Sequence, residues 1–183
     1  MGGLPNKRSP RALFIALSEL KLENAIQNLL HFDFYGFANQ DTIRLCNQNG
    51  LDCIVSFNGH IPRLQGIEQL LTADVGLVII PESEGSKTAV PGKLYEYIGA
   101  GVFILGLCPP DSVVARLISE YGHGIAVSID NVVAIKSALS IILTKFVNDQ
   151  LNKLSDIRQL SQYERSCQRG TLAKILRETV VEA

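Results

Sequence analysis

A short segment between two uncharged apolar runs constrains the fold of this chain more than any other feature. The runs are Val75–Ile80 and Val102–Leu107, and the segment Pro91–Gly101 between them reads PGKLYEYIGAG. Both runs are typical of parallel strands that are buried on both faces, and the segment has room for about two helical turns. We therefore expect a short helix that begins just beyond the carboxyl end of a buried strand.

The rest of the chain alternates helical and strand patterns in the same way. Helices are predicted over Pro10–Leu22, Asp41–Asn49, Pro62–Thr72, Asp111–Tyr121 and Asn131–Phe146, followed by a helical stretch from Asn148 to about Val181. Further strands are predicted over Leu29–Phe37, Leu51–Phe57 and Gly124–Ile129. Strict alternation of strands and helices means a parallel sheet with helices on both faces. The predicted fold class is therefore α/β, a Rossmann-like, doubly wound parallel sheet.

The predicted fold lacks a strand at its start. A helix that begins after Ser9 should follow a strand, but only Met1–Leu4 precede its loop. In doubly wound sheets the first strand is central. We therefore expect residues 1–183 to form one domain without its first strand, as a piece of a longer protein or with that strand supplied from elsewhere. Such a sheet would have an exposed gap, which predicts poor solubility or pairing with another chain.

Composition and charge argue against several classes of function. The formal net charge of −1 gives no general attraction to nucleic acid or to an anionic membrane, so no nucleic-acid partner is expected. No apolar run approaches the ~18 residues needed to cross a bilayer, and no signal peptide is visible, which favours the cytoplasm. The chain has no GxSxG motif, no phosphate-binding GxxxxGKS/T loop and no Asp-rich metal cluster, which argues against hydrolase, kinase and metal chemistry.

The four cysteines, Cys46, Cys53, Cys108 and Cys167, are scattered without CxxC pairs. That spacing argues against a zinc site and against a disulfide framework. We expect reduced thiols in the core or near the surface.

The helix predicted from Gly92 combines several features of an anion-binding site. It follows a strand, where open α/β sheets bind ligands, and a helix start presents free N–H groups to anions. On this helix Lys93 and Glu96 are three residues apart and share a face. The alternative interpretation is an i,i+3 salt bridge on a surface helix. The face that turns inward is expected to consist of Leu94, Tyr95 and Ile98.

Three loops are further candidates for binding. Near the amino terminus, the glycines at Gly2 and Gly3 would let the backbone approach a phosphate that Lys7 or Arg8 neutralises. The alternative there is a frayed terminus with solvated charges.

The other two loops follow predicted strands. The loop that contains Gly59, His60 and Ile61 has the character to lie against a flat base, or it is an ordinary connection with His60 on the surface. In the polar loop Pro81–Val90, carboxylates can accept hydrogen bonds from sugar hydroxyls, or the loop is simply solvated.

Taken in order, these segments resemble the C-terminal, donor-binding domain of a retaining glycosyltransferase of the group 1 (family 4) type, which has the GT-B fold. The resemblance covers nearly the whole chain, and the order of the motifs is more specific than any one of them. The matching segments are Gly2–Pro10, Phe34–Phe37, Val55–Pro62, Ala73–Leu77, Val90–Gly101 and Tyr163–Arg165.

The resemblance implies that the chain binds a nucleoside-diphosphate sugar as its donor, without a cofactor or a bound metal. The helix that starts at Gly92 would hold the diphosphate through the N–H groups near Lys93 and Leu94. Glu96 would hold the ribose hydroxyls, and the loop Gly59–Ile61 would face the base.

The resemblance also implies which cations take part in catalysis. Arg8 and Lys93 would stabilise the departing nucleoside diphosphate, so that electrostatics carries much of the rate. Many family members have Arg at the position of Gly3, so Lys7 or Arg11 is the candidate for that second cation here.

A carboxylate is implied as the sugar contact. Glu84 would take this role, although it lies farther from Glu96 than the paired glutamates of the family, and Glu82 competes with it.

These implications describe the nucleotide-sugar-binding half of a glycosyltransferase. The acceptor site would belong to an N-terminal half, on the same parent protein or on a separate chain, because 183 residues cannot hold both halves. The chain alone is therefore expected to show little or no transferase activity, and to meet a membrane only through a partner. The alternatives are a non-catalytic or split-subunit nucleotide-sugar-binding module, or half of a nucleotide-sugar epimerase.

Overall fold

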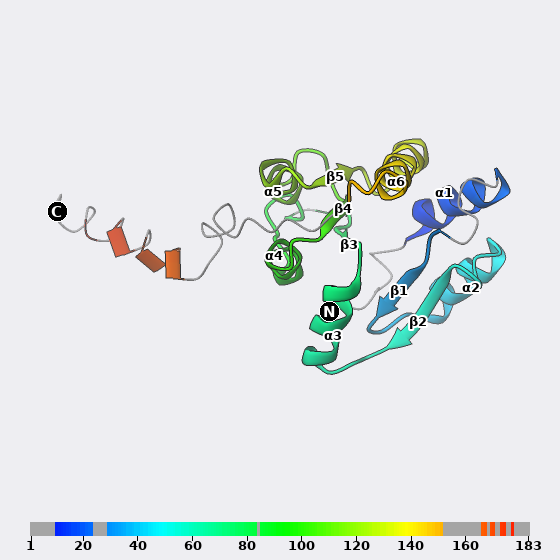
Figure 1. Cartoon of the computed structure of the whole chain (residues 1–183), viewed down its shortest axis with the longest axis horizontal. Coiled ribbons are helices and arrows are strands. Elements are labelled where there is room, and N and C mark those ends of the chain that lie inside the picture. Colours follow the sequence, from blue (N-terminus) through cyan, green and yellow to red (C-terminus); the bar gives the residue numbers. More distant parts are fainter. Residues whose placement is uncertain are drawn as a thin grey trace. The chain divides into compact units, whose positions relative to one another are not determined.

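The computed structural model of the chain (Figure 1) describes residues 10–23, 29–83 and 85–151, together with residues 166, 167, 169, 170, 173, 174 and 177. The chain divides into two units, Met1–Lys153 and Leu154–Ala183. The described residues of the second unit are helical, and most of the helical stretch expected after Asn148 lies outside the described residues. All the elements below belong to the first unit.

Helices and strands alternate along the described part of the first unit. The helices are α1 (Arg11–Leu22), α2 (Gln40–Gln48), α3 (Arg63–Thr72), α4 (Gly92–Gly99), α5 (Val113–Tyr121) and α6 (Val132–Val147). The strands are β1 (Phe32–Tyr35), β2 (Val55–Gly59), β3 (Val75–Ile79), β4 (Phe103–Leu107) and β5 (Gly124–Val127). Every strand pair is parallel. The predicted α/β class with parallel strands is confirmed.

These strands form two sheets rather than one continuous sheet. β1 pairs with β2, and the second sheet has the order β3-β4-β5. The register of β3 on β4 is regular, from Val75 opposite Phe103 to Ile79 opposite Leu107. Each strand is followed by a helix, so α2 to α6 all begin after the carboxyl end of a strand.

Most elements form within a few residues of their expected bounds, but β2 is displaced. The strand expected over Leu51–Phe57 is found at Val55–Gly59. The chain turns first, because the N–H groups of Ile54 and Val55 donate to the carbonyl oxygen of Leu51 at 2.9 and 2.8 Å. Gly59, which lies beyond the expected end of this strand, is its last residue and has a φ of +66° that favours glycine.

Side-chain caps begin three of the helices. The side chains of Asn39, Ser112 and Asn131 accept the N–H of the residue three positions ahead at 2.7, 3.1 and 3.0 Å. These bonds satisfy N–H groups that a helix start leaves unpaired, and so they define where α2, α5 and α6 begin. Ser9, after which the first helix was expected to begin, lies outside the described residues.

One buried cluster joins α1 and α6 to both sheets. Leu13, Phe14 and Leu17 of α1 are fully buried in it, together with Leu105 of β4 and Leu139 of α6. Aromatic residues of the first sheet also pack against this cluster. The two sheets therefore share one core although they do not share a hydrogen-bonded edge.

Candidate functional site

An apolar face that differs from the expected one holds α4 against β3. Leu94 and Ile98 are buried, as expected, but Tyr95 is 38% exposed. Tyr97 turns inward instead, and its ring lies so close to Gly76 that an added Cβ would be 2.5 Å from it. The expectation for Tyr95 is wrong, because the inward residues follow the i, i+3, i+4 spacing of a helix face.

The start of α4 is open. Among the described residues, no side chain caps this helix. Gly92 is exposed, and a Cβ added to it would meet no atom within 4 Å. The N–H of Leu94, one of those expected to hold a diphosphate, donates to the carbonyl oxygen of Pro91 at 3.0 Å. A helix start of this kind carries partial positive charge that favours an anion.

Lys93, beside this helix start, is tied to the backbone of β3. Its Nζ donates to the carbonyl oxygen of Leu77 at 3.3 Å, and the hydroxyl of Tyr97 donates to the same oxygen at 3.4 Å. Burial, with a smaller effect of the nearby Glu96 charge, raises the pKa of Tyr97 to about 12. The phenol therefore remains a hydrogen-bond donor at neutral pH.

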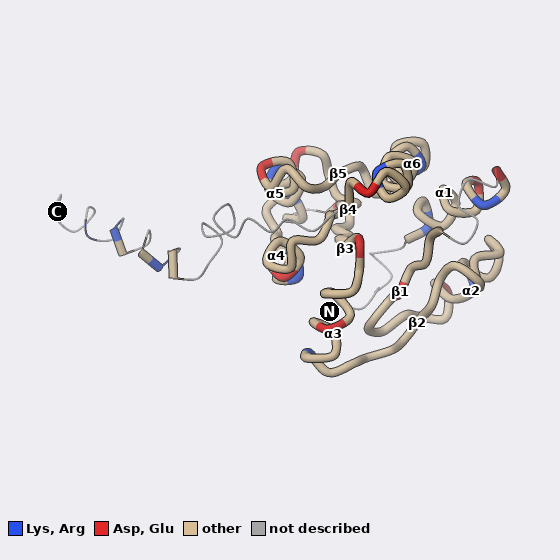
Figure 2. Tube along the Cα trace, in the orientation of Figure 1, with Lys and Arg blue, Asp and Glu red and all other residues tan. Residues whose placement is uncertain are grey.

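Glu96 pairs with a cation from another helix. Its Oε1 lies 3.4 Å from Nη2 of Arg63, the first residue of α3. Figure 2 shows acidic and basic positions together on α4 and a basic position at the start of α3. The contact joins the helix after β2 to the helix after β3. Sequence reasoning missed Arg63, although its place two residues after Ile61 was a usable signal.

The loop after β2 leads directly into Arg63. The carbonyl oxygen of Gly59 accepts the N–H of Gly36 at 2.6 Å, which holds the ends of β1 and β2 together. His60 is exposed and Ile61 is half-buried. Through the contact of Arg63 with Glu96, the structure brings this predicted base-binding loop next to the predicted ribose-binding carboxylate.

Internal hydrogen bonds shape the loop between β3 and α4. The buried Ser86 hydroxyl donates to the carbonyl oxygen of Ser83 at 2.6 Å and accepts the N–H of Ser83 at 3.1 Å. Farther along, Lys87 forms an ion pair with Asp111, just before α5. The hydrogen bond between them raises the pKa of Lys87 and lowers the pKa of Asp111. The described part of this loop is thus tied to the start of α5, while most of its residues remain exposed to solvent.

Three predicted site residues, Gly3, Arg8 and Glu84, lie outside the described residues, as does Lys7. Glu82, the competing sugar contact, is exposed. The site residues that the structure does bring together are therefore those of α4 and of the loop after β2.

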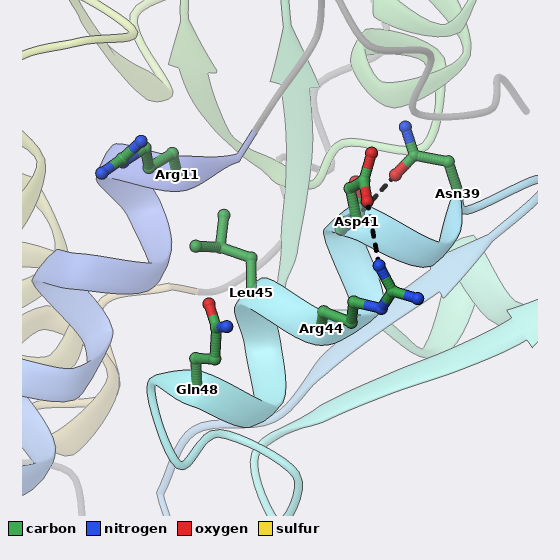
Figure 3. Close-up of a pocket in the computed structure, with 7 residues that line it drawn as sticks. Arg11, Asn39, Asp41, Arg44, Leu45 and Gln48 are labelled. Atoms are coloured by element: carbon green, nitrogen blue, oxygen red, sulfur yellow. Dashed lines mark hydrogen bonds and ion pairs between the residues drawn. The ribbon is translucent and has the colours of Figure 1, made fainter.

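A separate cavity of about 590 Å³ lies between the start of α1 and one side of α2 (Figure 3). Arg11, the candidate second cation, borders it from α1, and Arg44 and Asp41 of α2 form an ion pair at 3.7 Å on the other side. Two guanidinium groups and one carboxylate make this a polar cavity with an excess of positive charge. The lining residues are Arg11, Asn39, Asp41, Thr42, Arg44, Leu45 and Gln48.

Metal ligands are not clustered in the part of the chain that the structure describes, where no three His, Cys, Asp or Glu side chains are placed to hold an ion. Cys46 and Cys108 are buried, and Cys53 and Cys167 are exposed. None of the helices formed by described residues has the length and apolar character that a membrane crossing requires.

Comparison of the sequence with protein-family models finds no match, and comparison with curated proteins finds none either.

Proposed function

We propose that this chain is the donor-binding half of a glycosyltransferase and that it binds a nucleoside-diphosphate sugar at the start of α4. One observation carries the proposal. An uncapped helix start after a buried strand has a lysine beside it and, one turn on, a carboxylate that pairs with Arg63 of α3. Helix starts at the carboxyl ends of parallel strands are common binding sites for phosphate groups, and the resemblance of the sequence motifs supports a nucleotide sugar.

Each group near the start of α4 has a distinct role in this proposal. The first N–H groups of the helix bind the diphosphate, and the Lys93 ammonium neutralises the charge that develops on it as the sugar leaves. The Glu96 carboxylate accepts hydrogen bonds from the ribose hydroxyls. Arg63 keeps that carboxylate in place through its ion pair. The loop Gly59–Ile61 contacts the base.

The proposal extends to the surroundings of the chain. Transfer of the sugar requires an acceptor-binding half, which we expect on the parent protein or on a partner chain. We also propose a location in the cytoplasm, because the spacing of the four cysteines is not that of a disulfide framework.

Calorimetric titration of the whole chain with uridine, guanosine and adenosine diphosphates tests the proposal. We expect one of the three to bind. Glu96→Ala and Lys93→Ala should each weaken that binding by about 1–3 kcal/mol, because the hydrogen bonds they remove involve charged groups.

Matched controls come from α5, where Arg116 and Glu120 form an exposed ion pair at 3.6 Å. Arg116→Ala and Glu120→Ala remove the same kinds of charge away from the site, and both should leave the affinity unchanged. Failure to bind any of the three nucleotides, or unchanged affinity in both site variants, overturns the proposal.

A further inference from the structure

The cavity between the start of α1 and one side of α2 is bordered by an arginine that no carboxylate neutralises. This arginine is Arg11. The other described arginines of the first unit, Arg44, Arg63 and Arg116, form ion pairs with a carboxylate at 3.7, 3.4 and 3.6 Å. A guanidinium group without such a partner is suited to bind an anion, because its planar fork of N–H donors matches the oxygens of a phosphate or carboxylate.

Thr42 is a buried residue whose hydroxyl group faces the same cavity without a partner. The residue is 6% exposed and lines the cavity from α2. Its backbone N–H donates to the side chain of Asn39 at 2.7 Å, but its hydroxyl forms no hydrogen bond within the described part of the chain. Polar groups of buried residues almost always have a partner. An unpartnered hydroxyl at the wall of a cavity therefore points to a ligand that supplies one.

The rest of the lining supplies both hydrogen-bond donors and acceptors. Asp41 and Arg44 form their ion pair on the α2 side, where the Gln48 amide also borders the cavity. Figure 3 shows the side chains of Leu45 and Gln48 directed from α2 toward α1. Among the described lining residues, only Leu45 is apolar. A carboxylate, an amide and a guanidinium group together are suited to bind hydroxyl groups, because each hydroxyl both donates and accepts.

The volume of the cavity is that of a site for a small organic molecule. Such sites usually have volumes of about 300–1,000 Å³, and this cavity has about 590 Å³. We propose that it binds a free phosphate monoester of a polyol. Arg11 and the Thr42 hydroxyl bind the phosphate, and Asp41, Arg44 and Gln48 contact the hydroxyl groups. This proposal is independent of nucleotide binding, because none of the described lining residues belongs to α4.

Two features favour a free phosphate monoester over other anions. Arg11 is the first residue of α1, so the partial positive charge of the helix start adds to its own and favours a doubly charged phosphate over a carboxylate. The three terminal oxygens of a phosphate can also accept from the guanidinium and the Thr42 hydroxyl together. Lipid headgroups are usually recognised by clusters of about four to eight cations, whereas this lining has two arginines.

Calorimetric titration of the whole chain with sorbitol 6-phosphate, inorganic phosphate, sorbitol and gluconate tests the proposal. We expect sorbitol 6-phosphate to bind about tenfold or more tightly than inorganic phosphate, because only the former also contacts the hydroxyl-binding side of the cavity. Sorbitol lacks the anionic group and should show no binding. Gluconate carries a carboxylate in place of the phosphate and should bind more weakly than sorbitol 6-phosphate.

Three variants locate the binding site of sorbitol 6-phosphate. Arg11→Gln should weaken its binding about tenfold or more, because the hydrogen bonds that are lost involve a charged group. Thr42→Val keeps the shape of the buried side chain and removes only the hydroxyl, so it should weaken binding about fivefold without lowering stability in urea. Arg116→Gln, at an exposed arginine of α5, is the matched control and should leave the affinity unchanged.

Several outcomes overturn the proposal. Absence of binding, or an affinity no higher than that of inorganic phosphate or gluconate, means that the cavity does not recognise a polyol phosphate. Unchanged affinity in both Arg11→Gln and Thr42→Val means that the ligand binds elsewhere. Displacement of sorbitol 6-phosphate by a nucleoside diphosphate means that the cavity is part of the nucleotide site. Binding only to vesicles that contain phosphatidylinositol 4-phosphate means that a membrane is the partner.

Discussion

Arg63 and Glu96 form an ion pair between two helices that follow strands of different sheets. Nη2 of Arg63 lies 3.4 Å from Oε1 of Glu96, and the side chains are 80% and 38% exposed. Water therefore screens the pair, and we expect it to contribute little to stability. The pair instead positions the Glu96 carboxylate relative to the loop after β2. Arg63 directly follows that loop, and Glu96 lies in α4.

A double-mutant cycle with Arg63→Met and Glu96→Gln tests this view. The coupling energy from urea unfolding should be below about 1 kcal/mol, since exposed pairs rarely exceed that value. Arg63→Met should still weaken nucleotide binding, because the carboxylate loses the partner that orients it. A coupling energy well above 1 kcal/mol would show that the pair holds the fold together instead.

Replacement of Gly76 tests the contact of α4 with β3. An added Cβ would lie 2.5 Å from the Tyr97 ring, so Gly76→Ala should destabilise the protein by about 1–3 kcal/mol, as overpacking does. Gly99→Ala is the matched control, because no atom lies within 4 Å of its added Cβ. That variant should be as stable as the parent, or more stable by up to about 1 kcal/mol. Equal stability of both variants in urea would contradict the packing described here.

Alkaline unfolding should report on two buried phenols. Burial raises the pKa of Tyr97 and of Tyr121 from 10.0 to about 12. The unfolded chain loses these protons first, so their contribution to stability is complete below pH 10 and is lost as the pH rises to about 12. Tyr97→Phe should reduce the fall in unfolding free energy over this range, and the double variant with Tyr121→Phe should reduce it further. An unchanged pH dependence in both variants would contradict the burial of these rings.

On the acid side, His123 should make the protein sensitive to pH. Its Nε2 is buried without a hydrogen-bond partner among the described residues, and its ring lies edge-on to Phe103 and Tyr121. Burial, and to a lesser extent the charge of Lys145, lowers the pKa of His123 below 6.5. The unfolded chain then binds a proton more readily, so stability present above pH 6.5 is lost as the pH falls.

His123→Phe should reduce this loss of stability at acid pH, measured as unfolding free energy against pH. His60→Gln, at an exposed histidine, is the control and should leave the loss unchanged. If His123→Phe keeps the full acid dependence, other groups cause it.

The buried face of α4 shows which contacts a local sequence pattern can predict. Leu94 and Ile98 were predicted correctly from their spacing, because both lie on the apolar stripe. Tyr95 and Tyr97 are the same residue type on either side of Glu96, and hydrophobicity alone does not separate them. The i+3 position of Tyr97, and the absence of a side chain at Gly76, decide which ring is buried.

The candidate site was only partly predictable for a similar reason. The exposed, uncapped start of α4 follows from a proline and a glycine after a buried strand, which are local features. The partner of Glu96 does not, because Arg63 is 33 residues away and reaches it only in the folded chain. The acceptor of the Lys93 hydrogen bond, the carbonyl oxygen of Leu77, depends equally on the packing of α4 against β3.

By itself, the sequence determined the alternation of helices and strands, the parallel α/β class and the positions of most elements, since periodicity and capping act over a few residues. Only the tertiary structure decided that the strands form two sheets with one shared core, and that charges from α3 and α4 meet. Sheet pairing and side-chain contacts depend on segments far apart in the chain, and their free energies are absent from any local pattern.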